Sequence, residues 1–262
     1  MKKQLFYNFY VTRENFNGEV NNIHYKCLEY YKHVFEEVFI NITLDDIDDV
    51  ELIKMSKEKF LNIFDTCKKI TFTVNKNNTT LCESVFFWEE ILNKLNTLDL
   101  VFFAHNKGLT NLNNESYDRE SILHWIIALY YGSLHEYDNA IKLLTFDTFL
   151  FCGSCLTSRA DKFRFYSGTF FWLNAKRVYE HIHDYNIEVP KLCSRHSTEN
   201  FPQHIDLCKH NVLTSSNNMF LYFGEDMFDW WYTNAVQYCE WLGYLNDEFY
   251  KLYNFAINNN NI

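Results

Sequence analysis

The chain has 262 residues, of which 47% are hydrophobic and 19% aromatic, with 7 glycines and 2 prolines. This composition supplies the core of one large α/β domain, or of one domain with a small C-terminal addition. The formal net charge of −10 repels phosphate backbones, which argues against nucleic acid as the main partner. A local basic pocket for a diphosphate is compatible with that overall charge.

Cysteine usage and hydropathy favour a cytoplasmic protein. The eight cysteines are scattered without a framework spacing, as is typical of reduced thiols in a cytosol. The N-terminal segment at 1–11 is too short and too polar for a signal core. The longest apolar stretch, around Ile122 to Leu134, spans about 13 residues and contains His124, short of the roughly 20 residues of a membrane helix. We expect no transmembrane segment.

The first part of the chain alternates between strand and helix patterns. Aromatic and β-branched runs predict strands at 4–12, 37–43, 69–74 and 99–104. Apolar residues at helical spacing predict the helices between them, at about 21–34, 45–63 and 81–95. This order predicts an α/β fold with a mainly parallel, doubly wound, twisted sheet that helices flank on both faces.

The second part is less regular. An Asn-rich loop at 105–119 precedes a helix at about 121–134, and two strands follow at 149–156 and 162–173. After them come a short helix at 175–182 and a mostly irregular stretch at 184–218. The last expected element is an aromatic-rich amphipathic helix at 231–256. The sequence has no internal repeat and no Pro- or Ser-rich linker. We therefore expect a single domain over residues 1–257 and a disordered tail at 258–262.

A buried strand ends abruptly in a polar cluster at residues 100–108. Ligands bind beyond the carboxyl ends of strands in open α/β sheets. There Lys107 can neutralise a diphosphate, and Gly108 lets the backbone approach it. The alternative is an ordinary strand exit with a solvated His105 and Lys107.

A second segment, at 163–172, sets three small residues, Ser167, Gly168 and Thr169, among large aromatic residues. Small side chains leave room for a flat group, such as a sugar or a base, against the sheet. The alternative is a bulge or bend in which the glycine relieves crowding.

These two segments together resemble a group of glycosyltransferases from polysaccharide gene clusters. AHNKG at 104–108 and SGTFFW at 167–172 are similar to the H-x-K-(G/S) and (S/A)-G-x-(F/M)-F-W blocks of the rhamnan-synthesis type. YNFYV at 7–11 and HYKCLEYY at 24–31 also fit the opening of this group. The resemblance covers the chain to about Phe201.

The resemblance implies a GT-A fold, a nucleotide-sugar donor and a role in polysaccharide biosynthesis. It implies that the donor lies over the end of the first strand, the loop after the fourth strand and the small-residue segment. The implied donor-binding residues are Val11, Thr12, His105, Asn106, Lys107, Gly108, Ser167, Gly168 and Thr169. Glu83 is a further candidate that would orient the donor, with an exposed salt bridge as the alternative role.

Many relatives carry an Asp-x-Asp metal motif where this chain has residues 105–108. Asp46 and Asp48 have that spacing, but they lie at a predicted helix start after the second strand, where acidic residues complement the helix dipole. Either His105 contributes to a site for Mn or Mg that holds the diphosphate, or Lys107 replaces the metal electrostatically. The sequence assigns no metal ligands.

The candidate general base is Glu199, which follows the Gly168 segment at a distance comparable to that of the base in large inverting families. Thr198 and Glu199 equally fit a helix start. The expected reaction is transfer of the sugar to a glycan, a lipid-linked or another hydroxyl acceptor. One alternative is a non-catalytic nucleotide-sugar- or glycan-binding protein of the same fold. Another is an interaction protein that uses the aromatic C-terminal helix.

Overall fold

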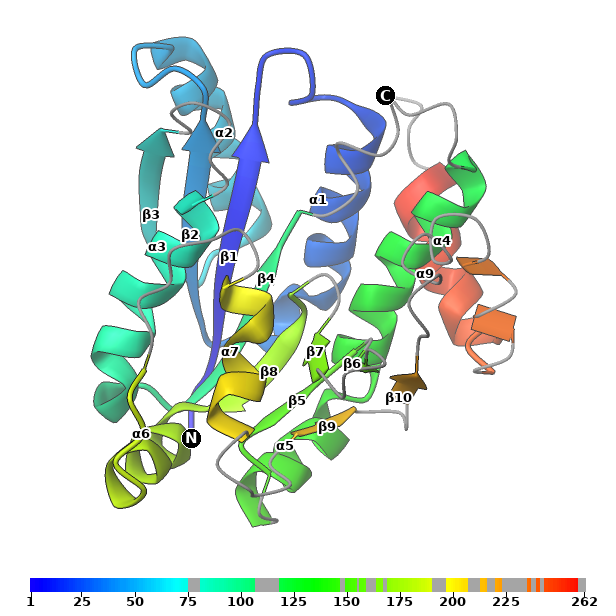
Figure 1. The fold of residues 1–262 in the computed structure, drawn as a ribbon. Helices are drawn as coiled ribbons and strands as arrows, with labels where there is room; N and C mark the ends of the chain where they lie inside the picture. Colours follow the sequence, from blue (N-terminus) through cyan, green and yellow to red (C-terminus); the bar gives the residue numbers. More distant parts are fainter. Residues whose placement is uncertain are drawn as a thin grey trace.

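A large sheet and a small sheet organise the computed structural model (Figure 1). The residues described are 1–74, 81–106, 118–146, 149–154, 156–158, 164–166, 169–189, 197–206, 213–215, 220–222, 235–236, 239–240 and 243–258. Within them, the large sheet has seven strands in the order β3-β2-β1-β4-β8-β5-β9, and the small sheet has three in the order β10-β6-β7. The strands are β1 (Lys3–Val11), β2 (Glu37–Leu44), β3 (Cys67–Val74), β4 (Leu100–His105), β5 (Phe151–Gly153), β6 (Leu156–Ser158), β7 (Arg164–Tyr166), β8 (Phe171–Asn174), β9 (Leu213–Ser215) and β10 (Phe220–Tyr222).

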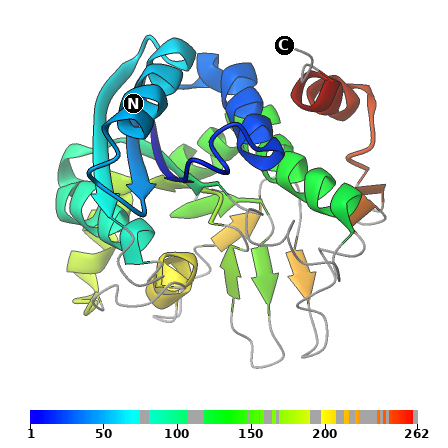
Figure 2. The ribbon, with the colours of Figure 1, turned by 90° about the horizontal axis from the view of Figure 1, so that it is seen from above.

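Helices flank the large sheet. They are α1 (Glu19–Tyr31), α2 (Val50–Ile63), α3 (Leu81–Glu90), α4 (Arg119–Tyr130), α5 (Tyr137–Phe146), α6 (Ala175–Asp184), α7 (Ser197–Asp206) and α9 (Asp247–Asn258), with 3-10 turns η1 (Lys32–Val34) and η3 (Leu92–Thr97) and a π-helical turn η4 (Tyr131–His135). Seen from above, α1 and α9 lie on the side of the molecule away from the small sheet (Figure 2). None of the helices in the described part of the chain is long and apolar enough to cross a membrane.

The strand directions follow the predicted α/β architecture. β1 pairs in parallel with β2 and β4, and β2 pairs in parallel with β3. β8 runs antiparallel to its neighbours β4 and β5, whereas β9 is parallel to β5. This mainly parallel sheet with flanking helices confirms the predicted α/β fold.

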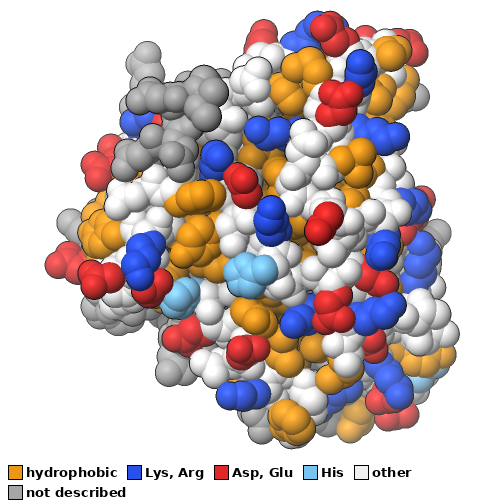
Figure 3. Space-filling view, turned by 180° about the vertical axis from the view of Figure 1, so that it is seen from behind, with side chains coloured by type: hydrophobic (Ala, Val, Ile, Leu, Met, Phe, Trp, Pro, Cys, Tyr) orange, Lys and Arg blue, Asp and Glu red, His pale blue; other side chains and the backbone are white. Residues whose placement is uncertain are grey.

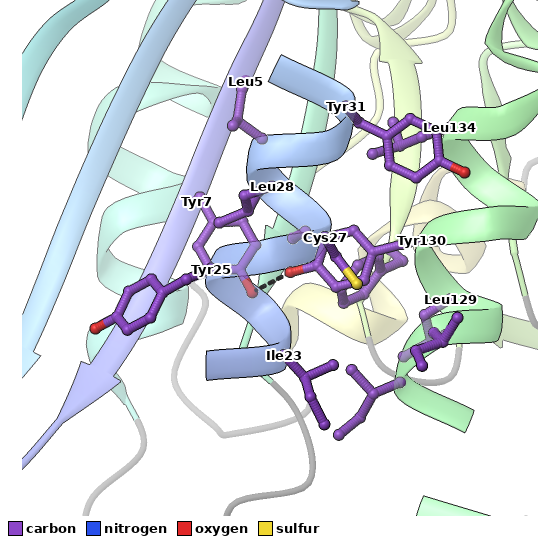
Figure 4. Packing of buried hydrophobic residues seen from close by; sticks show 14 of the residues in the cluster. Leu5, Tyr7, Ile23, Tyr25, Cys27, Leu28, Tyr31, Leu129, Tyr130 and Leu134 are labelled. Atoms are coloured by element: carbon purple, nitrogen blue, oxygen red, sulfur yellow. Dashed lines mark hydrogen bonds between the residues drawn. The ribbon is translucent and has the colours of Figure 1, made fainter. Parts of the chain in front are cut away.

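Alternating residues of β1 face two separate cores. Leu5, Tyr7 and Phe9 pack with α1, α2 and α4, whereas Phe6 packs with α3 and α7 on the other face. Figure 4 shows part of the first core, where the Tyr7 hydroxyl is hydrogen-bonded to Tyr130. Burying apolar area on both faces is the main stabilising contribution to such a sheet.

Several segments differ from the sequence-based expectation. The stretch expected to be mostly irregular contains the helix α7, which the internal Pro202 obscured because proline removes a helical hydrogen bond. The expected strand at 162–173 is divided into β7 and β8. The helix expected at 231–256 is interrupted, because residues 243–246 are not helical and α9 begins at Asp247, while residues 231–234 lie outside the described part of the chain. The apolar face of α9 is buried, with Phe249, Leu252 and Ala256 in the first core, so that face is not a free binding surface.

Candidate functional site

The exit of β4 is fixed by the side chain of Asn106. Its Oδ1 accepts a hydrogen bond from the backbone N–H of Tyr10 (2.8 Å), and its Nδ2 donates to the Tyr10 carbonyl (2.7 Å). Nδ2 also donates to Asn21 Oδ1 on α1 (2.9 Å). Both amide hydrogens of Asn106 therefore have protein partners, and the side chain ties the end of β4 to β1 and α1.

Glu83 lies against His105 in the interior. Glu83 is in the first turn of α3 and is 8% exposed, and its Oε2 lies 2.5 Å from His105 Nδ1. The two groups are close but not aligned as a hydrogen bond, so His105 Nδ1 has no hydrogen-bond partner. Glu83 Oε1, the second carboxylate oxygen, has no hydrogen-bond partner either. The alternative role of Glu83, an exposed salt bridge, is wrong because the side chain is buried at the start of α3.

A row of buried and half-buried polar side chains crosses the face of the sheet on which His105 lies. This row is here called the polar floor, and it consists of Asn8, Asn41, Thr43, Thr71 and Thr73. Asn8 pairs in register with both His105 and Asn41. Its Oδ1 accepts hydrogen bonds from Asn41 Nδ2 (2.6 Å) and Thr43 Oγ1 (3.1 Å).

Asn41 extends this network to β3. It donates to Thr73 Oγ1 (2.9 Å) and accepts from Thr71 Oγ1 (2.9 Å). Sequence reasoning missed the polar floor, although Asn and Thr at alternate positions of otherwise apolar strands, 41 with 43 and 71 with 73, were a usable signal.

Thr169 precedes β8, the strand that pairs with β4. The last pair of the β4–β8 ladder is Phe103 with Phe171, so Thr169 and His105 both lie beyond the end of this ladder. Thr169 is fully buried, has φ 57° and leaves its hydroxyl without a hydrogen-bond partner. A β-branched residue in the left-handed region is strained, and such strain is concentrated at functional sites.

Glu199 is brought toward the same region by helix α7. It lies in the first turn of α7 and is 6% exposed. The neighbouring Thr198 hydroxyl is hydrogen-bonded to the Ser84 hydroxyl (3.1 Å), next to Glu83 on α3. The helix-start interpretation of Thr198 and Glu199 is confirmed, and it is compatible with a role of the carboxylate at the site.

The remaining predicted residues are placed differently. Val11 is buried in the core formed with α1 and α2, on the face opposite the polar floor. Thr12 opens the turn after β1, and its N–H donates to Asn15 Oδ1 (2.8 Å). Lys107, Gly108, Ser167 and Gly168 lie outside the described residues.

The comparison with solved structures finds a weak likeness in fold, whereas the comparisons by sequence find none. No family model matches the chain, and no curated protein matches it. Among solved structures, the chain is similar to residues 1–349 of S. aureus TarS, a wall teichoic acid glycosyltransferase. The identity is 12%, the match covers 98% of this chain and 71% of that one, and the TM-score is 0.41. A likeness this low says nothing about the activity of this chain.

Proposed function

We propose that the chain is a cytoplasmic glycosyltransferase of polysaccharide biosynthesis. It transfers a sugar from a nucleotide-sugar donor to a glycan, a lipid-linked or another hydroxyl acceptor. The observation that supports this is the gathering of buried and half-buried polar groups from four segments toward the carboxyl end of β4 in a mainly parallel sheet. They are Glu83 on α3, His105 on β4, Thr169 before β8 and Glu199 on α7.

The donor lies over this edge in the proposed complex. The polar floor and His105 provide hydrogen-bonding groups beneath it, and Thr169 lies beyond the same end of the β4–β8 ladder. Asn106 acts by holding the end of β4 against β1. In the sequence, Lys107 and Gly108 follow directly, and we assign to them the charge and the close backbone approach that a diphosphate requires. Ser167 and Gly168 precede Thr169 and complete the proposed donor set, with Thr12 after the end of β1. Val11 is not part of this set, because it is fully buried on the opposite face of the sheet.

The proposed reaction is an in-line displacement. Glu199 takes the proton of the acceptor hydroxyl while that oxygen forms a bond to the anomeric carbon of the sugar. The bond between the anomeric carbon and the diphosphate oxygen breaks, and the diphosphate leaves with the electron pair. Lys107 stabilises the charge that develops on it.

Donor hydrolysis and transfer, measured with a panel of nucleotide sugars, test this proposal. Glu199→Gln keeps the shape of the side chain and removes the base, so we expect donor binding to persist while transfer falls about 100-fold or more. Glu58→Gln, on the exposed surface of α2, is the matched control. Transfer by Glu199→Gln at the parental rate would place the base elsewhere, for example at Asp206. Binding without turnover across the panel would favour the non-catalytic alternative.

A further inference from the structure

The short contact between Glu83 and His105 fixes where the proton of the imidazole ring lies. Glu83 Oε2 and His105 Nδ1 are 2.5 Å apart, and both side chains are almost fully buried. Without a proton on Nδ1, the lone pair of that nitrogen would face a carboxylate oxygen at this distance, and the two would repel each other. A proton on Nδ1 makes the contact attractive. The carboxylate therefore favours the form of the ring in which Nδ1 is protonated.

The second ring nitrogen of His105, Nε2, is then left with a lone pair. The two nitrogens of an imidazole ring point in different directions, so Nε2 points away from Glu83. Nδ1 is sealed from solvent, whereas Nε2 has no hydrogen-bond partner among the residues that the structure describes and is not one of its sealed atoms. In the neutral ring with the proton on Nδ1, Nε2 is an acceptor of hydrogen bonds.

Asn8 provides a donor beside this acceptor. It pairs in register with His105 on the neighbouring strand, so the two side chains lie on the same face of the sheet, on strands about 4.8 Å apart. Asn8 Oδ1 already accepts from Asn41 Nδ2 and Thr43 Oγ1, whereas Asn8 Nδ2 donates to no residue in the described part of the chain. A donor next to an acceptor matches a hydroxyl group, which accepts one hydrogen bond and donates another.

We propose that Glu83 is a positioning residue: it keeps the proton of His105 on Nδ1, so that His105 Nε2 and Asn8 Nδ2 together bind one hydroxyl group of the donor. This inference rests on the proposed function, because the donor is the nucleotide sugar proposed above. A hydroxyl group of the ribose and one of the transferred sugar offer the same chemistry. Glu83 acts through the imidazole ring and makes no contact with the donor itself.

The role of Glu83 can be measured without any ligand, from the ring nitrogens of His105 in ¹⁵N NMR spectra of the whole chain. Protonated and unprotonated ring nitrogens differ in chemical shift, and the His105 signals are identified by their loss in His105→Gln. We expect the neutral ring to carry its proton on Nδ1. Glu83→Gln keeps the shape and removes the charge, so a form with the proton on Nε2 should appear. Glu89→Gln, at an exposed site of α3, is the matched control and should change nothing.

Two outcomes of these spectra would overturn the role of Glu83: a proton on Nε2 in the parental chain, or an unchanged ring in Glu83→Gln. Both would leave the proposed function standing. Broadening of the His105 ring signals by manganese chloride would place a cation at Nε2 and overturn the assignment to a hydroxyl group.

Calorimetric titration in EDTA measures the hydroxyl contact, with UDP, GDP, TDP and the glucose conjugate of each as probes. For a probe that the parental chain binds, we expect Glu83→Gln to weaken binding about tenfold, the scale of one hydrogen bond. Asn8→Asp replaces the Nδ2 donor by an oxygen and should weaken the same probe, whereas Glu89→Gln should not. A loss shared by the free nucleotide assigns the hydroxyl to the ribose, and a loss confined to the conjugate assigns it to the sugar.

Parental affinity in either Glu83→Gln or Asn8→Asp would overturn the inference and leave the proposed function standing. No binding of any probe by the parental chain would overturn both.

Discussion

Thr169 combines backbone strain with a buried hydroxyl that has no partner. Glycine adopts positive φ freely, whereas a β-branched residue there costs about 1–2 kcal/mol. Thr169→Gly should therefore keep the free energy of unfolding within about 1 kcal/mol of the parental value, since relief of strain offsets the lost methyl packing. Donor affinity should fall, because the hydroxyl is gone. Urea unfolding and donor titration measure the two effects. Reduced stability with unchanged donor affinity would make Thr169 a structural residue only.

For single residues, some members of the site could be predicted from the sequence, but their contacts could not. His105 and Thr169 were recognisable because small or polar residues interrupt aromatic runs. The contact between Glu83 and His105 was not, because it joins the first turn of one helix to the end of the next strand through tertiary packing. No spacing rule encodes a distance of that kind.

Three elements are joined by one buried polar cluster on the face opposite the polar floor. The Tyr7 hydroxyl on β1, His24 Nδ1 on α1 and the Tyr130 hydroxyl on α4 lie within 2.8–3.0 Å of one another. Figure 4 shows the bond between the two tyrosines. Burial raises the pKa of both tyrosines well above the usual value, so both stay protonated.

Tyr130→Phe removes one member of this cluster and leaves the other two bonded. We expect a loss of about 1–2 kcal/mol in the free energy of unfolding, measured in urea. Donor affinity should not change, because the cluster lies on the other face of the sheet. Tyr250→Phe, at a side chain that is 42% exposed, is the control. Equal stability of the two variants would show that the cluster contributes nothing.

The strands and helices differ in how far the sequence determined them. β1 to β4 follow from apolar runs separated by helical patterns, because neighbouring segments of such a chain pair in parallel. β8 follows a long connection, and its antiparallel insertion between β4 and β5 depends on packing that is remote in sequence. The helix α5 was missed because its run of ten residues is short and only two of them, Ala140 and Leu144, are buried.

Over the whole molecule, charged side chains of both signs are interspersed on the face that Figure 3 shows. Several carboxylates have lowered pKa values in the folded state: Glu37 through a hydrogen bond from Lys2, Asp49 through Arg13, and Asp118 through the Ser121 N–H. A depressed folded pKa stabilises the fold above the unfolded pKa, and this contribution is lost as the pH falls through the folded value.

The melting temperature should consequently be level near neutral pH and fall steeply below about pH 4. A thermal melt across the acid range measures this. Asp118→Asn removes one of these carboxylates and should make the decline shallower. A melting temperature that stays constant to the acid end of the range would contradict the assignment of these contacts.

The central claim is that a nucleotide sugar binds at the carboxyl edge of β1 and β4, and hydrogen exchange read by mass spectrometry tests it most directly. The donor should slow exchange at the start of α3, the end of β4 and the start of α7, the segments that hold Glu83, His105 and Glu199. Exchange in α9 and α4, on the far side of the first core, should stay unchanged. Protection confined to α9 and α4, or no protection with any nucleotide sugar of the panel, would contradict the claim.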